Sequence, residues 1–221
     1  GAARMNVQIK ICGIREPEHA LVAAEAGADM IGLVFYPPSP RYVTIDEARA
    51  VVEAIRGSGV RAVGLFVNES AARINRVADA VGLDLIQLSG DEPIVMYGEI
   101  ERQVIPSIRV DSSGRCDEER RFGDVTGAEP APYAVMIDAH VPGMFGGTGT
   151  VADWFVAADF ARRYRTILAG GLRPETVGEA IRRVKPWAVD VSSGVETGGA
   201  KDTAKIRAFV GAAKGTVASL A

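Results

Sequence analysis

The sequence has few of the residues that bind metals or form disulfides. Only two cysteines, Cys12 and Cys116, and two histidines occur among its 221 residues. The cysteines lie far apart and lack the pair spacing of zinc sites and disulfide frameworks, so we expect neither. Such sparse cysteine usage is typical of a protein of the reducing cytoplasm, and we predict that location.

Long apolar runs and an excess of basic charge are also missing. No stretch approaches the ~20 apolar residues that cross a bilayer, and the N-terminus lacks the apolar core of a signal peptide. The formal net charge is -3, and the basic residues are dispersed along the chain. We therefore expect neither a membrane nor nucleic acid as a partner.

What the sequence does contain is a regular alternation of short apolar strands and helical patterns. The strands have β-branched residues in short runs, and the helices have apolar residues at helical spacing behind caps such as Thr44. The expected strands cover residues 7–11, 30–35, 61–67, 84–88, 104–110, 133–137, 166–169 and 187–191. The expected helices cover 17–26, 44–55, 70–78, 92–102, 116–122, 151–160, 174–184 and 202–213.

Eight strand and helix units favour a single (β/α)8 TIM barrel over a doubly wound parallel sheet. The Gly-x-Gly-x-x-Gly sequence of dinucleotide-binding sheets is absent after the first strand. We expect one barrel domain over residues 6–221. Residues 1–5 are interpreted as a cloning remnant, 1–4, followed by the native start at Met5.

In such a barrel the active site lies at the C-terminal ends of the strands. The loops that follow the seventh and eighth strands contain Gly170, Gly171, Ser193 and Gly194. Glycine there satisfies turn geometry, but two such loops side by side are also typical of a phosphate site made of backbone N–H groups. We expect a phosphorylated small molecule as substrate, with Gly147 in a third flexible loop above the same rim.

Three side chains on this rim carry possible chemistry. Cys12 directly follows the first strand and Asp138 the sixth, and a thiol with a carboxyl group can act as base and acid. Cys12 taken alone also has the character of a small buried core residue. Arg41 follows three prolines in the loop after the second strand and could present its guanidinium to a carboxylate, although most arginines are surface residues.

Seven short segments add a stronger signal when they are taken in order. They are 10–14, 32–36 with 39–42, 64–68, 87–90, 146–149 with 153–154, 169–172 and 189–196. Together they resemble the signature segments of the phosphoribosylanthranilate isomerase family, across essentially the whole chain. That resemblance implies a (β/α)8 barrel that carries out an Amadori rearrangement in tryptophan biosynthesis, an aldose–ketose isomerisation that needs no cofactor and no metal.

The resemblance also implies roles for individual residues. Asp138 matches the general acid that opens the furanose ring, and Cys12 matches the base that removes the neighbouring carbon's proton. Arg41 matches the arginine that binds the anthranilate carboxylate. Asp190 lies at a strand end that faces the substrate, and the loops with Gly170, Gly171, Ser193 and Gly194 match the phosphate site.

Alternatives remain at this point. One is the related aminoaldose isomerase of histidine biosynthesis, or a bifunctional barrel, although that reaction is expected to use an aspartate where this chain has Cys12. Another is a non-catalytic barrel that binds phosphate metabolites. Ser89 departs from the family pattern, which has histidine there, and the sequence does not decide between a monomer and a homodimer.

Overall fold

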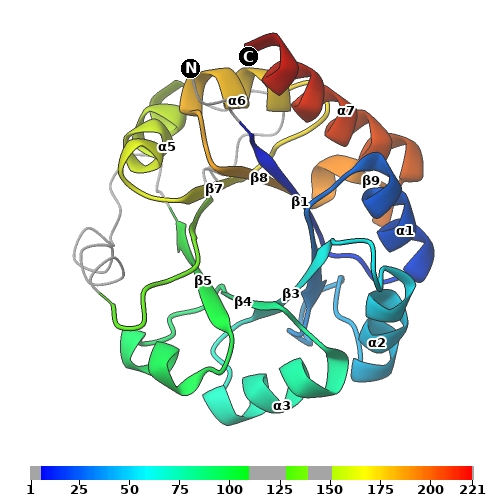
Figure 1. Cartoon of the computed structure of the whole chain (residues 1–221), viewed down its shortest axis with the longest axis vertical. Coiled ribbons are helices and arrows are strands. Elements are labelled where there is room, and N and C mark those ends of the chain that lie inside the picture. Colours follow the sequence, from blue (N-terminus) through cyan, green and yellow to red (C-terminus); the bar gives the residue numbers. More distant parts are fainter. Residues whose placement is uncertain (1–5, 110–127, 139–150, 221) are drawn as a thin grey trace.

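The computed structural model describes residues 6–109, 128–138 and 151–220. Eight parallel strands form a closed barrel, in which each strand pairs with the next and the last pairs with the first (Figure 1). The strands are β1 (Gln8–Cys12), β2 (Met30–Val34), β3 (Arg61–Phe66), β4 (Leu85–Leu88), β5 (Gln103–Arg109), β6 (Val135–Asp138), β7 (Thr166–Ala169) and β8 (Ala188–Val191). The predicted barrel is confirmed, and the doubly wound sheet is excluded.

The helices surround this barrel (Figure 1). They are α1 (Pro17–Ala26), α2 (Ile45–Ala54), α3 (Ala71–Val81), α5 (Val151–Arg163), α6 (Val177–Val184) and α7 (Thr203–Leu220). The predicted cap of α2 is present as a reciprocal capping box: Thr44 accepts the backbone N–H of Glu47, whose carboxylate accepts the backbone N–H of Thr44. Gly27 ends α1 with a φ of 95°, which glycine adopts without strain.

The connection between β4 and β5 differs from the prediction. Instead of an α-helix over residues 92–102 it forms a 3-10 helix, η1 (Ile94–Glu99). Glu92 is 3% exposed and its carboxylate accepts the backbone N–H groups of Asn68 and Gly90 at 2.7 and 2.9 Å. Glu92 therefore joins two loops instead of opening a helix. The predicted helix over residues 116–122 lies outside the described residues.

Side chains that alternate along the strands divide the core in two. One apolar cluster fills the space between strands and helices, and a second fills the barrel interior, with Met30, Val63, Leu85, Ile105 and Met136 among its members. Residues two positions further along the same strands also face inward. Nearer the C-terminal ends this inward layer becomes polar, because it includes the buried residues Gln87 and Asp190.

The N-terminal end of the barrel is closed by aromatic and arginine side chains. Tyr133 and Trp187 meet edge to face with ring centroids 5.6 Å apart, and the Arg165 guanidinium lies 5.0 Å from both centroids. Arg61 contacts the Tyr133 hydroxyl and ring. These contacts bear on stability, since the chemistry of this fold lies at the other end.

Within the described ranges, no helix has the length and apolarity needed to cross a bilayer.

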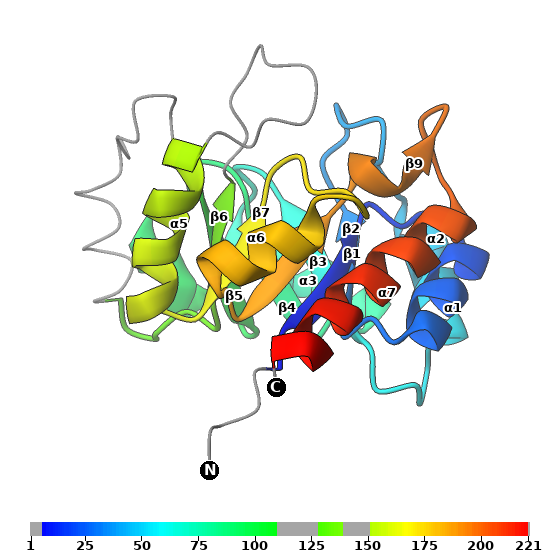
Figure 2. The ribbon, with the colours of Figure 1, turned by 90° about the horizontal axis from the view of Figure 1, so that it is seen from above.

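The chain after β8 adds structure that the sequence analysis did not predict. It forms a short 3-10 helix, η2 (Ser193–Val195), and then an antiparallel hairpin of β9 (Glu196–Thr197) and β10 (Ala200–Lys201). Figure 2 shows β9 beyond the C-terminal ends of β1 and β2. Gly198 and Gly199 form the turn with φ of 59° and 81°, as a two-residue hairpin turn requires. The hairpin is thereby placed at the rim expected to carry the chemistry.

Candidate active site

Cys12 lies at the C-terminal end of β1 with 5% of its surface exposed. Gly13 follows with a φ of 77°, and the N–H groups of Gly13 and Ile14 both donate to the carbonyl of Gly32 at 3.0 Å. Gly32 is the strand neighbour of Cys12 on β2, and a Cβ built there would lie 2.7 Å from the sulfur. The thiol therefore occupies space that the missing side chain of Gly32 leaves open, at the inner rim of the barrel.

A buried ion pair lies on the same inner face. Lys10 on β1 is fully buried and its Nζ donates to Oδ1 of Asp190 on β8 at 2.7 Å. Burial acts against the charged ammonium, but the attraction of Asp190 and Cys12 and hydrogen bonds to both raise the pKa of Lys10 above its ordinary value. Asp190 thus reaches the inner rim where it was expected, and its described partner is a lysine of the adjacent strand.

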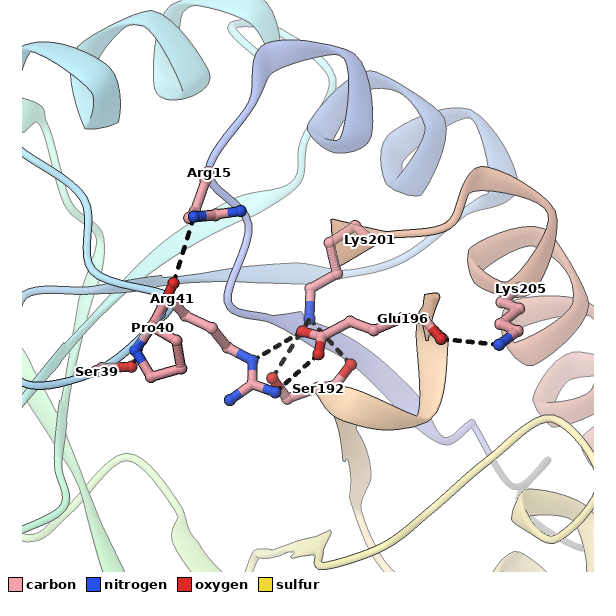
Figure 3. Close-up of polar contacts among 8 residues, drawn as sticks. All are labelled: Arg15, Ser39, Pro40, Arg41, Ser192, Glu196, Lys201 and Lys205. Atoms are coloured by element: carbon pink, nitrogen blue, oxygen red, sulfur yellow. Dashed lines mark hydrogen bonds and ion pairs between the residues drawn. The ribbon is translucent and has the colours of Figure 1, made fainter. Parts of the chain in front are cut away.

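Arg41 reaches the rim from the loop that follows β2. Its side chain crosses Gly13, where an added Cβ would lie 2.5 Å from Arg41 Cδ, so glycine at position 13 also makes room for the arginine. Nε and Nη2 of Arg41 donate to the two carboxylate oxygens of Glu196 at 2.7 and 2.8 Å (Figure 3). These hydrogen bonds raise the pKa of Arg41 above its ordinary value. Arg41 thus pairs with Glu196, a carboxylate partner within the protein that the sequence analysis did not predict.

Lys201 completes this arrangement from the second strand of the hairpin. Its Nζ donates to Glu196 Oε1 at 2.6 Å, to the carbonyl of Ser192 at 2.9 Å and to the Ser192 hydroxyl at 3.3 Å (Figure 3). Burial lowers the pKa of Lys201 even though Glu196 acts in the opposite direction. Burial disfavours the ionised form of Glu196, yet Arg41 and Lys201 hold the pKa of its carboxyl group below the ordinary value. The hairpin is therefore tied to the end of β8 and to Arg41 by one carboxylate.

The loops after β7 and β8 lie against each other at the rim. Gly170 and Gly171 have φ of 97° and 64°, so both need the freedom of glycine. Gly194, in η2, packs so closely on the carbonyl oxygen of Leu172 that a Cβ would overlap it. Ser193 opens η2 and is exposed. The two predicted glycine loops therefore form one surface, whereas Gly147 lies outside the described residues.

Asp138 ends β6, next to the strand that leads to the first glycine loop. It pairs in register with Ala169 at the end of β7. Asp138 shares the inward face of β6 with Met136, a member of the interior cluster, because the two are two residues apart on one strand. β7 and β8 separate β6 from β1 around the barrel, so Cys12 and Asp138 belong to the same inner rim on either side of the glycine loops.

Ser89, which departs from the family pattern, takes part in a hydrogen-bond chain. Its hydroxyl accepts from Gln87 Nε2 at 3.0 Å and lies 3.3 Å from the hydroxyl of Ser107 on β5. Oε1 of Gln87 is buried without a hydrogen-bond partner among the described residues. Serine therefore preserves a polar link between β4 and β5 at this rim.

Three charged residues of the site were not assigned roles from the sequence: Lys10, Glu196 and Lys201. A lysine two residues before a cysteine on an apolar strand was a signal for an inward charge, since both face the same side. The Gly198-Gly199 pair between short segments was a signal for the hairpin. No group of three metal-ligating side chains comes together in the parts of the chain that the structure describes.

Comparison with known proteins agrees with this geometry. Residues 9–212 match the family described as N-(5'phosphoribosyl)anthranilate (PRA) isomerase. The N-(5'-phosphoribosyl)anthranilate isomerase of Roseiflexus sp. (strain RS-1) is 50% identical over 215 residues, which is 94% of this chain and 98% of that protein. The counterpart from Geobacter sulfurreducens is 44% identical over 210 residues, covering 95% of this chain and 99% of that protein.

Solved structures give the same relationship. The phosphoribosyl anthranilate isomerase of Thermotoga maritima superposes with a TM-score of 0.81 at 38% identity, over 95% of this chain and 100% of that one. A second structure, with a TM-score of 0.78 at 38% identity over 95% of this chain and 100% of that one, is a complex with reduced 1-(o-carboxyphenylamino)-1-deoxyribulose 5-phosphate. The closed barrel, the inner rim and these relatives together show that the chain belongs to the phosphoribosylanthranilate isomerase family, the aldose–ketose isomerases of tryptophan biosynthesis.

Proposed function

We propose that this protein rearranges N-(5'-phosphoribosyl)anthranilate to 1-(o-carboxyphenylamino)-1-deoxyribulose 5-phosphate, with Cys12 as general base and Asp138 as general acid. The observation that carries the assignment is the placement of these two residues at the inner C-terminal ends of β1 and β6, with the paired glycine loops between them. A sugar phosphate anchored at the loops would have its ring between the thiol and the carboxyl group.

The rearrangement needs two proton transfers. The carboxylic acid of Asp138 gives its proton to the furanose ring oxygen, and the bond between that oxygen and the first sugar carbon breaks, which leaves a Schiff base to the anthranilate nitrogen. The thiolate of Cys12 then takes the proton from the second sugar carbon, and the electrons of that bond move toward the nitrogen to form an enolamine. Tautomerisation of the enolamine gives the aminoketose.

Binding of the substrate is assigned to the two ends of the site. The backbone N–H groups around Gly170, Gly171, Ser193 and Gly194 would hold the phosphate, as the loops after the seventh and eighth strands do in many barrels of this type. Arg41 would bind the anthranilate carboxylate. Glu196 occupies Nε and one edge of Nη2, and no hydrogen bond from Nη1 is made within the described part of the chain, so a second edge of the guanidinium remains for a carboxylate.

The test is the decay of phosphoribosylanthranilate fluorescence with purified protein. Wild type should turn the substrate over, whereas Cys12→Ala and Asp138→Asn should each be slower by about 100- to 10,000-fold, the usual contribution of one acid or base. Cys116→Ala is the matched cysteine control and should keep wild-type activity. The aminoaldose of histidine biosynthesis should remain unreacted.

Two results would contradict the proposal. If wild type fails to convert phosphoribosylanthranilate, the site does not perform this reaction, and binding of phosphate metabolites without catalysis becomes the better account. If Cys12→Ala or Asp138→Asn keeps full activity, the reaction stands but the residue in question is not its acid or base.

A further inference from the structure

The fully buried ammonium of Lys10 is unusual enough to need an explanation. Taking a charge out of water is costly, and a buried ion pair is often no more stable than apolar residues in its place. The Lys10–Asp190 pair lies at the polar end of the barrel interior, where it is adjacent to the proposed catalytic base. Stability alone is therefore a weak reason for a lysine at this position.

The geometry brings the Lys10 ammonium to the Cys12 sulfur. The two residues are two positions apart on β1 and so share its inward face. A Cβ built on Gly32 would lie 2.7 Å from Cys12 Sγ and 3.2 Å from Lys10 Nζ, so both atoms border the same space left by one glycine. Burial lowers the pKa of Lys10, but Asp190 and the attraction of a thiolate at Cys12 together raise it above the ordinary value.

Among the described residues, five charged groups near Cys12 carry a net positive charge. Three cations would attract a thiolate at Cys12 electrostatically, and two carboxylates neutralise them in part. The strand neighbour of Cys12 on β2 is Gly32, which adds no charge. The five groups are Lys10 on β1, Arg41 after β2, Asp190 on β8, Glu196 on β9 and Lys201 on β10. One positive charge is left over, and a thiolate at Cys12 would neutralise it.

We propose that Lys10 is the counter-ion that keeps the Cys12 sulfur in its thiolate form, and that Asp190 is a positioning residue that holds Lys10 and does not bind substrate. This inference rests on the proposed function, because it explains how Cys12 is ready to act as a base. When the thiolate takes a proton from the sugar carbon, an S–H bond forms and a C–H bond breaks. Lys10 keeps its own proton throughout and loses only its anionic neighbour.

The two possible roles of Lys10, structural partner of Asp190 or counter-ion of Cys12, predict different effects on the ionisation of Cys12 when charges are removed. If Lys10 acts only to pair with Asp190, replacing both by neutral residues leaves the ionisation of Cys12 unchanged. If Lys10 stabilises the thiolate, the same double replacement makes the thiolate harder to form. Removing Asp190 alone should have the opposite effect, because the Lys10 ammonium then has Cys12 as its nearest anionic partner.

The experiment is a pH titration of the thiolate's ultraviolet absorbance, which needs no reagent to enter the buried site. Wild type, Asp190→Asn and the double variant Lys10→Met/Asp190→Asn are each measured against the same protein carrying Cys12→Ser, so that only Cys12 contributes to the difference. The double variant avoids a lone buried carboxylate that would prevent folding. Lys214→Met, which removes an exposed lysine of α7, is the matched control.

The expected midpoints move in opposite directions. Removing both charges should raise the pH of half-ionisation by about one to three pH units, as expected for the loss of an opposite charge at close range. Asp190→Asn should lower it, and Lys214→Met should leave it unchanged. The acid limb of the kcat/KM profile should follow the same order among the active variants.

Two outcomes would overturn the inference. Coincident titrations of wild type and the double variant would show that Lys10 does not support the thiolate. An unchanged midpoint in Asp190→Asn would show that Asp190 does not act on Cys12 through Lys10. Because the titration measures Cys12 directly, it decides this question even if the proposed isomerase reaction fails.

Discussion

Arg41 and Glu196 are 155 residues apart in the chain and form a two-point ion pair, with Nε 2.7 Å from Oε1 and Nη2 2.8 Å from Oε2. Lys201 holds the same carboxylate from the other side at 2.6 Å. The Arg41 guanidinium is therefore fixed before any substrate arrives. An arginine whose side chain is ordered during folding loses less entropy when it binds a ligand, so this ordering would favour binding of the carboxylate proposed for Arg41.

Replacing Glu196 by Gln should weaken substrate binding more than it slows the chemical step. Arg41 would lose its charged partner and Lys201 its counter-ion, so the guanidinium would no longer be held in one place. We expect KM to rise about tenfold, since charge-assisted hydrogen bonds contribute roughly 1.5 kcal/mol or more, with a smaller fall in kcat. Steady-state kinetics measures both constants.

The matched control for that variant is Glu25→Gln. Glu25 also pairs with an arginine, Arg207, at 3.0 Å, but on the exposed outer surface. Its replacement should leave KM and kcat unchanged. Equal effects of the two variants would mean that the Arg41–Glu196 pair has no special role in binding.

Glu196 should also make stability depend on pH in the acidic range. Arg41 and Lys201 hold its pKa in the folded protein below the ordinary value of 4.5. The ionised carboxylate therefore stabilises the fold fully above about pH 4.5, and this contribution is lost as pH falls through the lower folded pKa. The difference in Tm between wild type and Glu196→Gln should therefore be constant from about pH 5 to neutrality, where Glu196 is ionised in both the folded and the unfolded protein. Below that range the difference should shrink. A difference that grows toward acid pH would contradict this sign.

Gly194→Ala should separate the two glycine loops. Its new methyl group would overlap the carbonyl oxygen of Leu172, so one loop would have to move. We expect competitive inhibition by inorganic phosphate to weaken by about tenfold, the loss of roughly one charged hydrogen bond. Gly215→Ala is the control, because nothing lies within 4 Å of the position a Cβ would take there. Unchanged phosphate inhibition in Gly194→Ala would place the anion elsewhere.

Thr44→Ala should destabilise the barrel without changing activity. It removes the side-chain half of the capping box at the start of α2, which typically contributes about 1 kcal/mol. Urea unfolding should report a lower free energy of unfolding, with kcat and KM unchanged. Thr44→Ser keeps the hydroxyl and should remain close to wild type, so an equal loss in both variants would implicate the methyl group instead of the cap.

The repeating part of the fold could be predicted because each unit carries its own signals. β1 and α1 show this: a β-branched run ends at Cys12, Gly13 turns the chain, Pro17 opens the helix and Gly27 ends it. The same local patterns gave eight strands, and an eight-fold repeat predicts a barrel. Rim positions such as Cys12 then follow from where each strand ends.

Contacts between distant loops could not be predicted in the same way. Glu92 has the local character of a helix start, yet it is buried because it accepts N–H groups from the loop after β3 and from its own loop. The partner of Arg41 is equally remote in sequence, and nothing near either residue specifies the pairing. Such choices depend on which loops the closed barrel brings together, which is a property of the whole chain.

The position of Lys10 and Asp190 in the chain determines when this ion pair can form during synthesis. The two residues are on the first and last strands and are separated by 180 positions. A ribosome adds about 5–20 residues per second, so roughly 9 to 36 seconds pass between them during synthesis. An unfinished chain has a lysine in its first strand with no carboxylate to meet it, and only the final seam of the barrel provides one. The ion pair can therefore form only after β8 has been synthesised, and a fragment that ends before β8 lacks it.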